Sequence, residues 1–460
     1  MTTNAPNTDP NSCPNAFPNT DPRARRLAEF RDQRFGLFVH WGVYAAAARH
    51  EWVRQREGLT LSQYQSYVDH FDPDLYDPEA WAEAARYAGM RYTVLTSKHH
   101  DGFCLWDSAL TDYSVAATPY GKDLVGPFVS AFRAAGLGVG FYHSLLDWQH
   151  PKFPLDRIHP EWDDETGDPG DRDMRAYADY LHGQVEELLT RYGPVDTLWF
   201  DFSYEGRIRQ GKPVTGGKGP DHWRAHELMA LIRRLQPGCL VNNRLGIPGD
   251  FTTPEEYQPL VPPGEVWEAC QTLNGSWGYD RDNLNWKTPE QLIALLVDTV
   301  SKDGNLLLNV GPNARGEFEP RALAVLRGIG DWMRLHSRSI HGAGPSSYTA
   351  PTGCRYTRRG DRLYVHLLEW PYKHLHLPGL DGRVRYAQFL HDASEVRPVN
   401  TDPSWDNGNV TPKGIPDGAY TLDLPVRRPD VVLPVIELFL GAEETEDADG
   451  TDGTDARGRA

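Results

Sequence analysis

The sequence has no run of about 18 consecutive apolar residues, the shortest run that spans a bilayer as a helix. This absence excludes a membrane-spanning helix and predicts a soluble protein with no membrane partner. The N-terminal residues also lack the early positive charge and the apolar core that a secretory signal requires. The sequence therefore predicts a cytoplasmic location.

Basic residues and cysteines are both scarce. Lys and Arg number 47 against 64 Asp and Glu, and the net charge of −17 disfavours a nucleic-acid partner, because neutralising phosphates requires a basic surface. The five cysteines are odd in number, lie far apart and form no CxxC pair. They indicate neither a disulfide framework nor a thiolate zinc site.

Two catalytic signatures are also missing. No GxSxG motif occurs, so the nucleophile elbow of a serine hydrolase is not indicated. No GxxxxGK[ST] motif is present, so phosphate chemistry has no support either. These absences direct attention to carboxylates, histidines and aromatic residues.

The two ends of the chain have little to bury. Residues 1–24 repeat Asn, Pro, Thr and Asp, which predicts a flexible N-terminal segment. Residues 441–460 are acidic, glycine-rich and free of aromatics, which predicts a disordered tail. The total length of 460 residues suits one large barrel with a smaller partner domain.

Between these ends, short β-rich apolar runs alternate with helical patterns, which is typical of repeated strand–helix units with a parallel sheet. The predicted strands lie within residues 34–42, 92–100, 137–145, 196–202, 239–245, 266–273 and 305–311. Asp77 and Pro78 mark one helix start, and residues 288–291 form a capping box before another. The pattern predicts a (β/α)8-like TIM barrel as the catalytic domain over residues 25–341, with its active site at the carboxyl ends of the strands.

A doubly wound open sheet is the alternative architecture. It favours a glycine-rich GxGxxG turn after the first strand, and the segment FVHWGVYAA has none. Beyond the barrel, residues 342–440 show alternating short strands with turns and no convincing helix. They predict a C-terminal antiparallel β-sandwich domain.

Tryptophans are dense near the predicted strand ends, where histidines, carboxylates and an arginine also lie. A sugar suits this mixture, because its C–H faces stack on aromatic rings while its hydroxyls need convergent donors and acceptors. Some of these tryptophans are expected to fill the core instead. The tryptophans concerned are Trp41, Trp52, Trp106, Trp148, Trp199, Trp267 and Trp277.

Glycoside hydrolysis needs two carboxyl groups that flank the bond to be cleaved. Asp201 ends the apolar run DTLWFDF, where an unpaired carboxylate costs several kcal/mol, so its presence suggests a function. Glu255 follows the next strand and is expected near Asp201 at the barrel mouth. Glu256 is adjacent to it and Glu268 lies in the following strand, so the pattern leaves the choice among the three glutamates open.

The tract Lys98-His99-His100-Asp101 contains residue types that bind zinc or iron. Successive strand residues point to opposite faces, so His99 and His100 are not expected to reach one ion without a bulge. The sequence therefore predicts no metal site. Neutral histidines that hydrogen-bond a ligand's hydroxyls are favoured over metal ligands.

Taken together, the motifs resemble the α-L-fucosidases of glycoside hydrolase family 29. The similarity runs in order from about residue 34 to residue 340, and the β-sandwich continuation also fits. The motifs that carry it are FGLFVHWGVY (35–44), EW (51–52), AGMRYTVLTSKHHDGFCLWDS (88–108), GFYHSLLDW (140–148), LWFD (198–201), NNR (242–244), SWGY (276–279) and VSKDGNLLLNVGP (300–312). The tracts KHHDGF and GNLLLNVGP are the most specific of them.

The resemblance implies a retaining exo-glycosidase that removes terminal α-L-fucose from oligosaccharides or glycoconjugates through a covalent glycosyl-enzyme intermediate, without a cofactor. It places the nucleophile at Asp201 and ranks Glu255 first as the acid/base. Phe202 after the nucleophile departs from common members. The implied sugar-binding residues are His40, Glu51, Trp52, His99, His100, either Tyr142 or His143, Trp199, Arg244 and Trp277.

Three other functions stay open from the sequence. A barrel that binds sugar without chemistry is disfavoured because Asp201 and Glu255 are both present. A metal-dependent barrel hydrolase would be sensitive to a chelator. A glycosidase for α-L-galactosides is the nearest enzymatic alternative, because an apolar contact with the C5 methyl group discriminates against a hydroxylated analogue only modestly.

Overall fold

The computed structural model shows two compact units, one ending at Gly344 and the other beginning at Pro345. The structure describes residues 21–163, 165–168, 170–206, 208–209, 212–213, 215–399 and 413–441. The predicted disordered tail therefore lies outside the described residues beyond residue 441, as does the predicted flexible N-terminal segment up to residue 20. Residues 22–24 of that segment form the start of a helix, α1 (Pro22–Gln33), which Asp21 caps through its side chain.

A seven-stranded parallel sheet forms the centre of the first unit, with the strand order β7-β4-β3-β2-β1-β9-β8. Nearly all of its residues are buried, as expected for parallel strands that are covered on both faces. The strands are β1 (Phe35–Val39), β2 (Tyr92–Lys98), β3 (Gly138–Ser144), β4 (Thr197–Asp201), β7 (Leu240–Val241), β8 (Glu268–Thr272) and β9 (Asn305–Val310). Each lies within a run that the sequence predicted.

The segment 250–256 closes this sheet into a barrel between its two edge strands. On one side, Phe251 bridges Asn242 just after β7. On the other side, Thr252 bridges Trp267, just before β8, and Glu255 bridges Cys270 in β8. All three bridges are parallel. This segment therefore takes the place of an eighth strand in the barrel wall, held by isolated bridges rather than by regular strand pairing.

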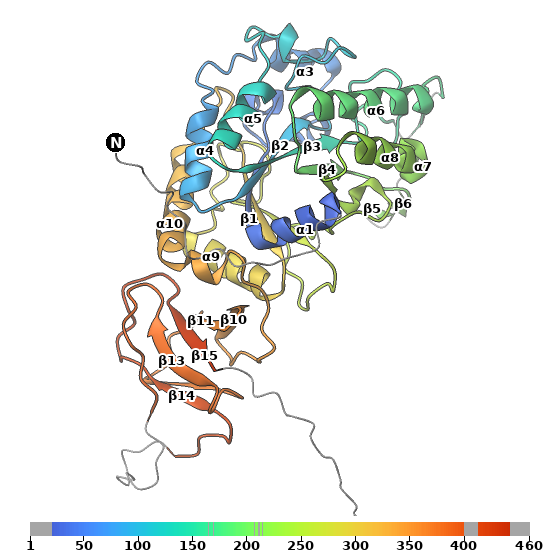
Figure 1. Cartoon of the computed structure of the whole chain (residues 1–460). Helices are drawn as coiled ribbons and strands as arrows, with labels where there is room; N and C mark the ends of the chain where they lie inside the picture. Colours follow the sequence, from blue (N-terminus) through green and yellow to red (C-terminus); the bar gives the residue numbers. More distant parts are fainter. Residues whose placement is uncertain are drawn as a thin grey trace, which may run out of the picture. The chain divides into compact units, whose positions relative to one another are not determined.

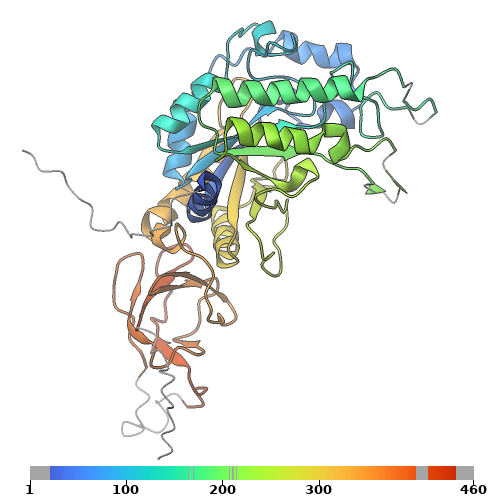
Figure 2. The ribbon, with the colours of Figure 1, turned by 45° about the vertical axis from the view of Figure 1, so that its right-hand side comes forward.

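Helices surround the strands of the barrel (Figure 1). The larger ones are α4 (Pro78–Tyr87), α5 (Val125–Ala134), α6 (Met174–Arg191), α8 (Ala225–Leu235), α9 (Pro289–Ser301) and α10 (Pro320–His336), and the smaller ones are α2 (Val53–Arg56), α3 (Leu61–Asp69) and α7 (Pro220–Trp223). The predicted cap at Asp77 and the capping box of Thr288 with Gln291 are both confirmed. Helices α6 and α8 pack side by side outside the sheet (Figure 2). Among the described residues, none of the helices combines the length and the apolar character needed to cross a membrane.

The barrel interior is filled by large side chains. Phe30 of α1 packs against Tyr92 and Phe251, with ring centroids 5.3 and 5.0 Å away. Because Tyr92 begins β2, helix α1 covers the amino ends of the strands. Higher in the barrel, Phe38 packs against Trp199 at 5.2 Å. The opposite, carboxyl end is left for a ligand site.

The second unit is antiparallel, as predicted. Its main sheet has the order β10-β11-β15-β13, and a smaller sheet pairs β12 with β14. Leu363, Val365, Ile436 and Leu438 belong to one buried cluster that forms its core. The strands are β10 (Cys354–Arg359), β11 (Arg362–Leu367), β12 (His374–Leu377), β13 (Val384–Phe389), β14 (Tyr420–Asp423) and β15 (Val435–Leu440), and a further hairpin in the first unit is β5 (Ile208–Arg209) with β6 (Lys212–Pro213).

Candidate active site

A cavity of about 1100 Å³ opens at the carboxyl ends of the barrel strands. Its wall combines carboxylates, histidines, an arginine and aromatic rings, which is the mixture that the sequence analysis associated with a sugar. All but one of the predicted site residues line it. These are His40, Glu51, Trp52, His99, His100, Tyr142, Trp199, Asp201, Arg244, Glu255 and Trp277.

His143 is the exception among the predicted pocket residues. Its side chain is fully buried, and its Nδ1 lies 3.2 Å from the hydroxyl of Ser97, outside the residues that line the cavity. Successive side chains of a strand point to opposite faces, so the neighbour Tyr142 faces the cavity and His143 faces away. Of the two alternatives that the sequence left open, the structure places Tyr142 at the site.

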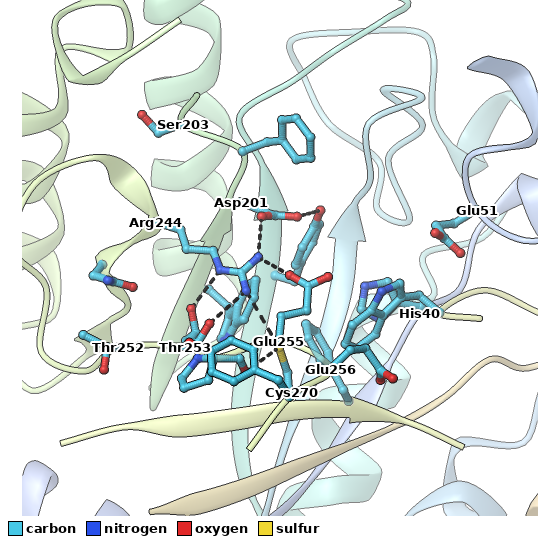
Figure 3. Close-up of a pocket in the computed structure, with 18 of the residues that line it drawn as sticks. His40, Glu51, Asp201, Ser203, Arg244, Thr252, Thr253, Glu255, Glu256 and Cys270 are labelled. Carbon is cyan, nitrogen blue, oxygen red and sulfur yellow. Dashed lines mark hydrogen bonds and ion pairs between the residues drawn. The ribbon is translucent and has the colours of Figure 1, made fainter. Parts of the chain in front are cut away.

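Arg244 lies between the two candidate catalytic carboxylates (Figure 3). Its Nη1 is 2.9 Å from Asp201 Oδ1 and 2.7 Å from Glu255 Oε2. The distance between Asp201 Oδ1 and Glu255 Oε2 therefore cannot exceed the sum of these two contacts. That sum is less than ~6.5 Å, the shortest separation between the two carboxyl groups of an inverting glycosidase. The guanidinium thus holds both carboxylates close while offsetting their mutual repulsion.

Further contacts fix this arrangement. Tyr142 donates its phenolic hydrogen to Asp201 Oδ2 at 3.0 Å. Arg244 donates to the Thr253 hydroxyl at 2.8 Å and to the Thr253 carbonyl at 3.0 Å, and its guanidinium lies 4.4 Å above the Trp199 ring. Burial alone would lower the pKa of Arg244, but the charges of Asp201 and Glu255 raise it above the usual arginine value. Arg244 is therefore a permanent cation in the site.

The other two candidate glutamates are engaged elsewhere. Glu256 Oε1 accepts from the Thr272 amide at 2.5 Å, and its Oε2 pairs with Lys287 at 3.2 Å. Glu268 is buried inside the barrel and accepts from Tyr92 at 2.6 Å and from Trp199 at 3.0 Å. Burial raises the pKa of Glu268 to about 7. Of the three glutamates, Glu255 alone contacts the arginine that also holds Asp201.

His99 and His100 both reach the cavity, with ring centroids 4.1 Å apart. The expectation that they point to opposite faces is wrong, because β2 ends at Lys98 and its register with β3 shifts between Thr96 and Lys98. The two histidines thus follow the strand rather than belong to it. In the described part of the chain, no group of three or more His, Cys, Asp or Glu is arranged to hold a metal ion.

Neighbouring residues fix which ring nitrogen of His40 carries its hydrogen. Asn309 donates its amide to the Trp277 carbonyl at 2.7 Å, so its Oδ1 is the atom that accepts from His40 Nδ1, also at 2.7 Å. Burial lowers the pKa of His40 to about 3, so the ring is neutral at pH 7. The remaining nitrogen, Nε2, is therefore a hydrogen-bond acceptor.

His100 is held in the same way. Ser144 donates its hydroxyl hydrogen to the Leu146 carbonyl at 2.8 Å and lies 2.6 Å from His100 Nδ1, which must then be the donor of that contact. Burial lowers the pKa of His100 to about 3. Its Nε2, 3.9 Å from Asp201 Oδ2, is again an unprotonated acceptor. Two acceptors for ligand hydroxyls thus face the cavity.

The wall beside these histidines is aromatic. Trp52 lies 5.0 Å from His100 and 5.3 Å from Phe202, while Trp277 lies 5.0 Å from His40. Glu51 is buried beside this wall and accepts from the Gly278 amide at 2.9 Å. Burial raises the pKa of Glu51. The wall offers apolar surface next to hydrogen-bonding groups, as recognition of a sugar requires.

Three polar residues that support the pocket could not be predicted from the sequence. Asn309, Ser144 and Thr253 orient His40, His100 and Arg244 respectively. Asn309 and Ser144 lie within predicted strands, where a polar residue in an apolar run is the one signal that they gave. Thr253 lies in a segment that reads as a loop, and its contact with Arg244 is purely tertiary.

Gly102 ends the tract that carries the two histidines, and we expect Gly102→Ala to destabilise the fold. Its φ is 82°, and an added Cβ would lie 2.2 Å from Asp147 Oδ1, while the other oxygen of that carboxylate, Oδ2, pairs with buried Lys98. The free energy of unfolding, measured by chemical denaturation, should fall by about 3 kcal/mol or more. Gly136→Ala is the control, because Gly136 has a φ of 76° with nothing within 4 Å of its Cβ, and a loss of about 1–2 kcal/mol is expected. Equal losses would contradict the importance of the Asp147 contact.

Comparisons with known proteins agree with this geometry. The sequence matches the model of the family described as alpha-L-fucosidase over residues 7–338. The tissue alpha-L-fucosidase of Rattus norvegicus is 31% identical over 376 residues, which cover 74% of this chain and 76% of the relative. The solved structure of alpha-L-fucosidase isoenzyme 1 from Paenibacillus thiaminolyticus is 44% identical with a TM-score of 0.83, and the match covers 91% of this chain and 100% of that one.

A second solved structure is an alpha-L-fucosidase of glycoside hydrolase family 29 from Bacteroides thetaiotaomicron, described as a trapped covalent intermediate in complex with 2-fluoro-fucosyl fluoride. It is 28% identical with a TM-score of 0.77, and the match covers 91% of this chain and 96% of that one. The family match spans most of the barrel unit, and the similar structures cover both units. The chain therefore belongs to the α-L-fucosidases of glycoside hydrolase family 29 and is a glycoside hydrolase.

Proposed function

We propose that this α-L-fucosidase acts on terminal α-L-fucosyl groups of oligosaccharides or glycoconjugates with retention of configuration, Asp201 being the nucleophile and Glu255 the acid/base. The observation that carries the proposal is the pair of contacts from one nitrogen of Arg244 to both carboxylates. Retaining enzymes need carboxyl groups about 5–5.5 Å apart, because one of them must reach the anomeric carbon directly. The upper limit set by Arg244 is consistent with that separation.

The first displacement forms a bond between a carboxylate oxygen of Asp201 and the anomeric carbon, while the bond from that carbon to the leaving oxygen breaks. Glu255 in its acid form gives its proton to the leaving oxygen. This step requires Glu255 to exchange its contact with Arg244 for one with the substrate. Its side chain is 41% exposed, which leaves it free to turn, whereas that of Asp201 is 16% exposed.

The second displacement reverses these roles. Glu255, now a carboxylate, takes a proton from water as the water oxygen attacks the anomeric carbon. The bond to Asp201 breaks and returns its electron pair to the carboxylate. Two inversions at one carbon give net retention, and no cofactor takes part.

The sugar is proposed to lie against the histidines and the aromatic wall that adjoins them. His40 and His100 would accept hydrogen bonds from its hydroxyls through Nε2, and the cation Arg244 would donate to an oxygen. The wall of Trp52 and Trp277 would cover the C5 methyl group of fucose, which has no hydrogen-bonding capacity. The remaining proposed contacts come from Glu51, His99, Tyr142 and Trp199.

The anomer released first tests the proposed mechanism. Wild-type enzyme with p-nitrophenyl α-L-fucoside should give α-L-fucose as the first product, detected by proton NMR before mutarotation mixes the anomers. The α-L-galactoside and the β-D-galactoside serve as comparison substrates, and the fucoside should be the best of the three. Release of β-L-fucose first would overturn retention.

A further inference from the structure

An exposed apolar segment borders the cavity on the side of Glu255. Leu260 is 95% exposed and Val261 is 72% exposed, and Tyr257 close by is 59% exposed. All three line the same cavity as Asp201 and Glu255, together with Pro259 and Pro263. Other exposed apolar side chains, such as Leu284, do not line this cavity. Neighbouring apolar residues at the mouth of a site mark a binding surface rather than ordinary surface variation.

The backbone of this segment is held in place. Lys302, directly after α9, donates to the Pro259 carbonyl at 2.8 Å, and the Gln258 side chain donates to Thr299 of α9 at 3.1 Å. Prolines before and after Leu260 and Val261 restrict the chain further, because each fixes φ. The segment therefore presents Leu260 and Val261 from a fixed base and loses little entropy when a ligand covers them.

The position of the segment indicates which part of the substrate it meets. Under the proposed function, on which this inference rests, Glu255 contacts the oxygen that leaves the fucose. Tyr257 follows Glu255 by two residues, and the segment extends the cavity wall from there. The histidines and Trp277 are the residues proposed to hold the fucose, so the leaving group is the part of the substrate left to meet Leu260 and Val261.

The chemistry of the segment indicates the kind of leaving group. The side chains of Leu260, Val261 and the prolines have no donor or acceptor, whereas a sugar needs polar partners for its hydroxyls. Glu256, which directly precedes Tyr257, is occupied by Thr272 and Lys287. We propose that this segment is a subsite for an apolar leaving group, a hydrocarbon chain or ring attached to fucose.

Methyl and octyl α-L-fucosides separate this subsite from the chemistry, because their leaving alcohols have nearly the same acidity and differ in apolar length. Wild-type kcat/KM should be at least about tenfold higher for the octyl fucoside, measured below its micelle concentration. The double variant Leu260→Ser/Val261→Ser should bring this ratio close to one while its kcat/KM for the methyl fucoside stays unchanged. The control Leu284→Ser replaces a leucine that is 82% exposed and should keep the wild-type ratio.

Several outcomes would overturn the subsite. One is a wild-type ratio of octyl to methyl kcat/KM near one, and another is a ratio that the double variant does not change. A third is that the wild type prefers a fucosylated disaccharide to the octyl fucoside and that the double variant loses this preference. A change of oligomeric state in sedimentation with an unchanged ratio would assign the segment to contact with a second copy instead. α-L-Fucosyl fluoride has a leaving group too small to reach the segment, so its turnover by every variant supports the proposed function independently. Failure of the wild type to cleave any fucoside would overturn the proposed function itself.

Discussion

Replacing Asp201 by alanine is expected to lower kcat for an aryl α-L-fucoside by about 10⁴-fold or more while leaving binding of the sugar largely intact. The change removes the atom that forms the covalent bond but leaves the histidines and the aromatic wall in place. Turnover is measured from release of the aryl group, and binding from protection of the fold by fucose in thermal unfolding. A variant with a rate near that of wild type would remove Asp201 from the nucleophile role.

Azide distinguishes loss of the nucleophile from general damage. In Asp201→Ala, azide can occupy the vacated space, attack from the side that Asp201 held and give β-L-fucosyl azide, the inverted product. Asp196→Ala is the matched control, because Asp196 precedes β4 at its amino end and pairs with Arg26 rather than facing the cavity. That variant should keep its activity and form no azide product.

Replacing Glu255 by alanine is expected to give an effect that depends on the leaving group. An alkyl fucoside, whose leaving oxygen needs a proton, should lose about 10²–10⁴-fold in rate. Fucosyl fluoride needs less assistance in the first displacement, but the second displacement has lost its base. The variant should therefore release a burst of fluoride close to one equivalent of enzyme and then slow down, as followed with a fluoride electrode.

Azide and the neighbouring glutamate complete the test of Glu255. In Glu255→Ala, azide attacks the covalent intermediate without needing a base, so turnover should rise and the product should be α-L-fucosyl azide, with configuration retained. Glu256→Ala is the control, since that carboxylate is bound to Thr272 and Lys287. A fluoride burst in Glu256→Ala, and none in Glu255→Ala, would transfer the acid/base role to Glu256.

The regular part of the barrel could be predicted from sequence because its strands are continuous apolar runs. Asp201 stood out for the same reason, as a charge at the end of such a run. The closing segment 250–256 is not among the predicted strands, because the residues that form its bridges lack the β-rich pattern of a strand. Helix α1 was partly assigned to the flexible N-terminal segment because few of its residues are apolar, and Phe30 alone is buried.

Side-chain choices within the site depended on tertiary structure. Strand alternation correctly separates Tyr142 from His143, but choosing between them requires knowing which face lines the cavity. The same rule fails for His99 and His100, because the strand ends one residue earlier. The three glutamates could not be ranked from local pattern, since what distinguishes Glu255 is an arginine 11 positions before it in sequence that meets it only in the folded barrel.

The two carboxylates that are proposed to be catalytic lie on barrel segments of unequal regularity. Asp201 ends β4, which pairs with both β3 and β7, whereas Glu255 lies on segment 250–256, which isolated bridges hold in place. An insertion or deletion beside segment 250–256 would shift Glu255 along the chain without unpairing β4, the strand that carries Asp201. The fold therefore constrains the position of Asp201 along the chain more tightly than that of Glu255.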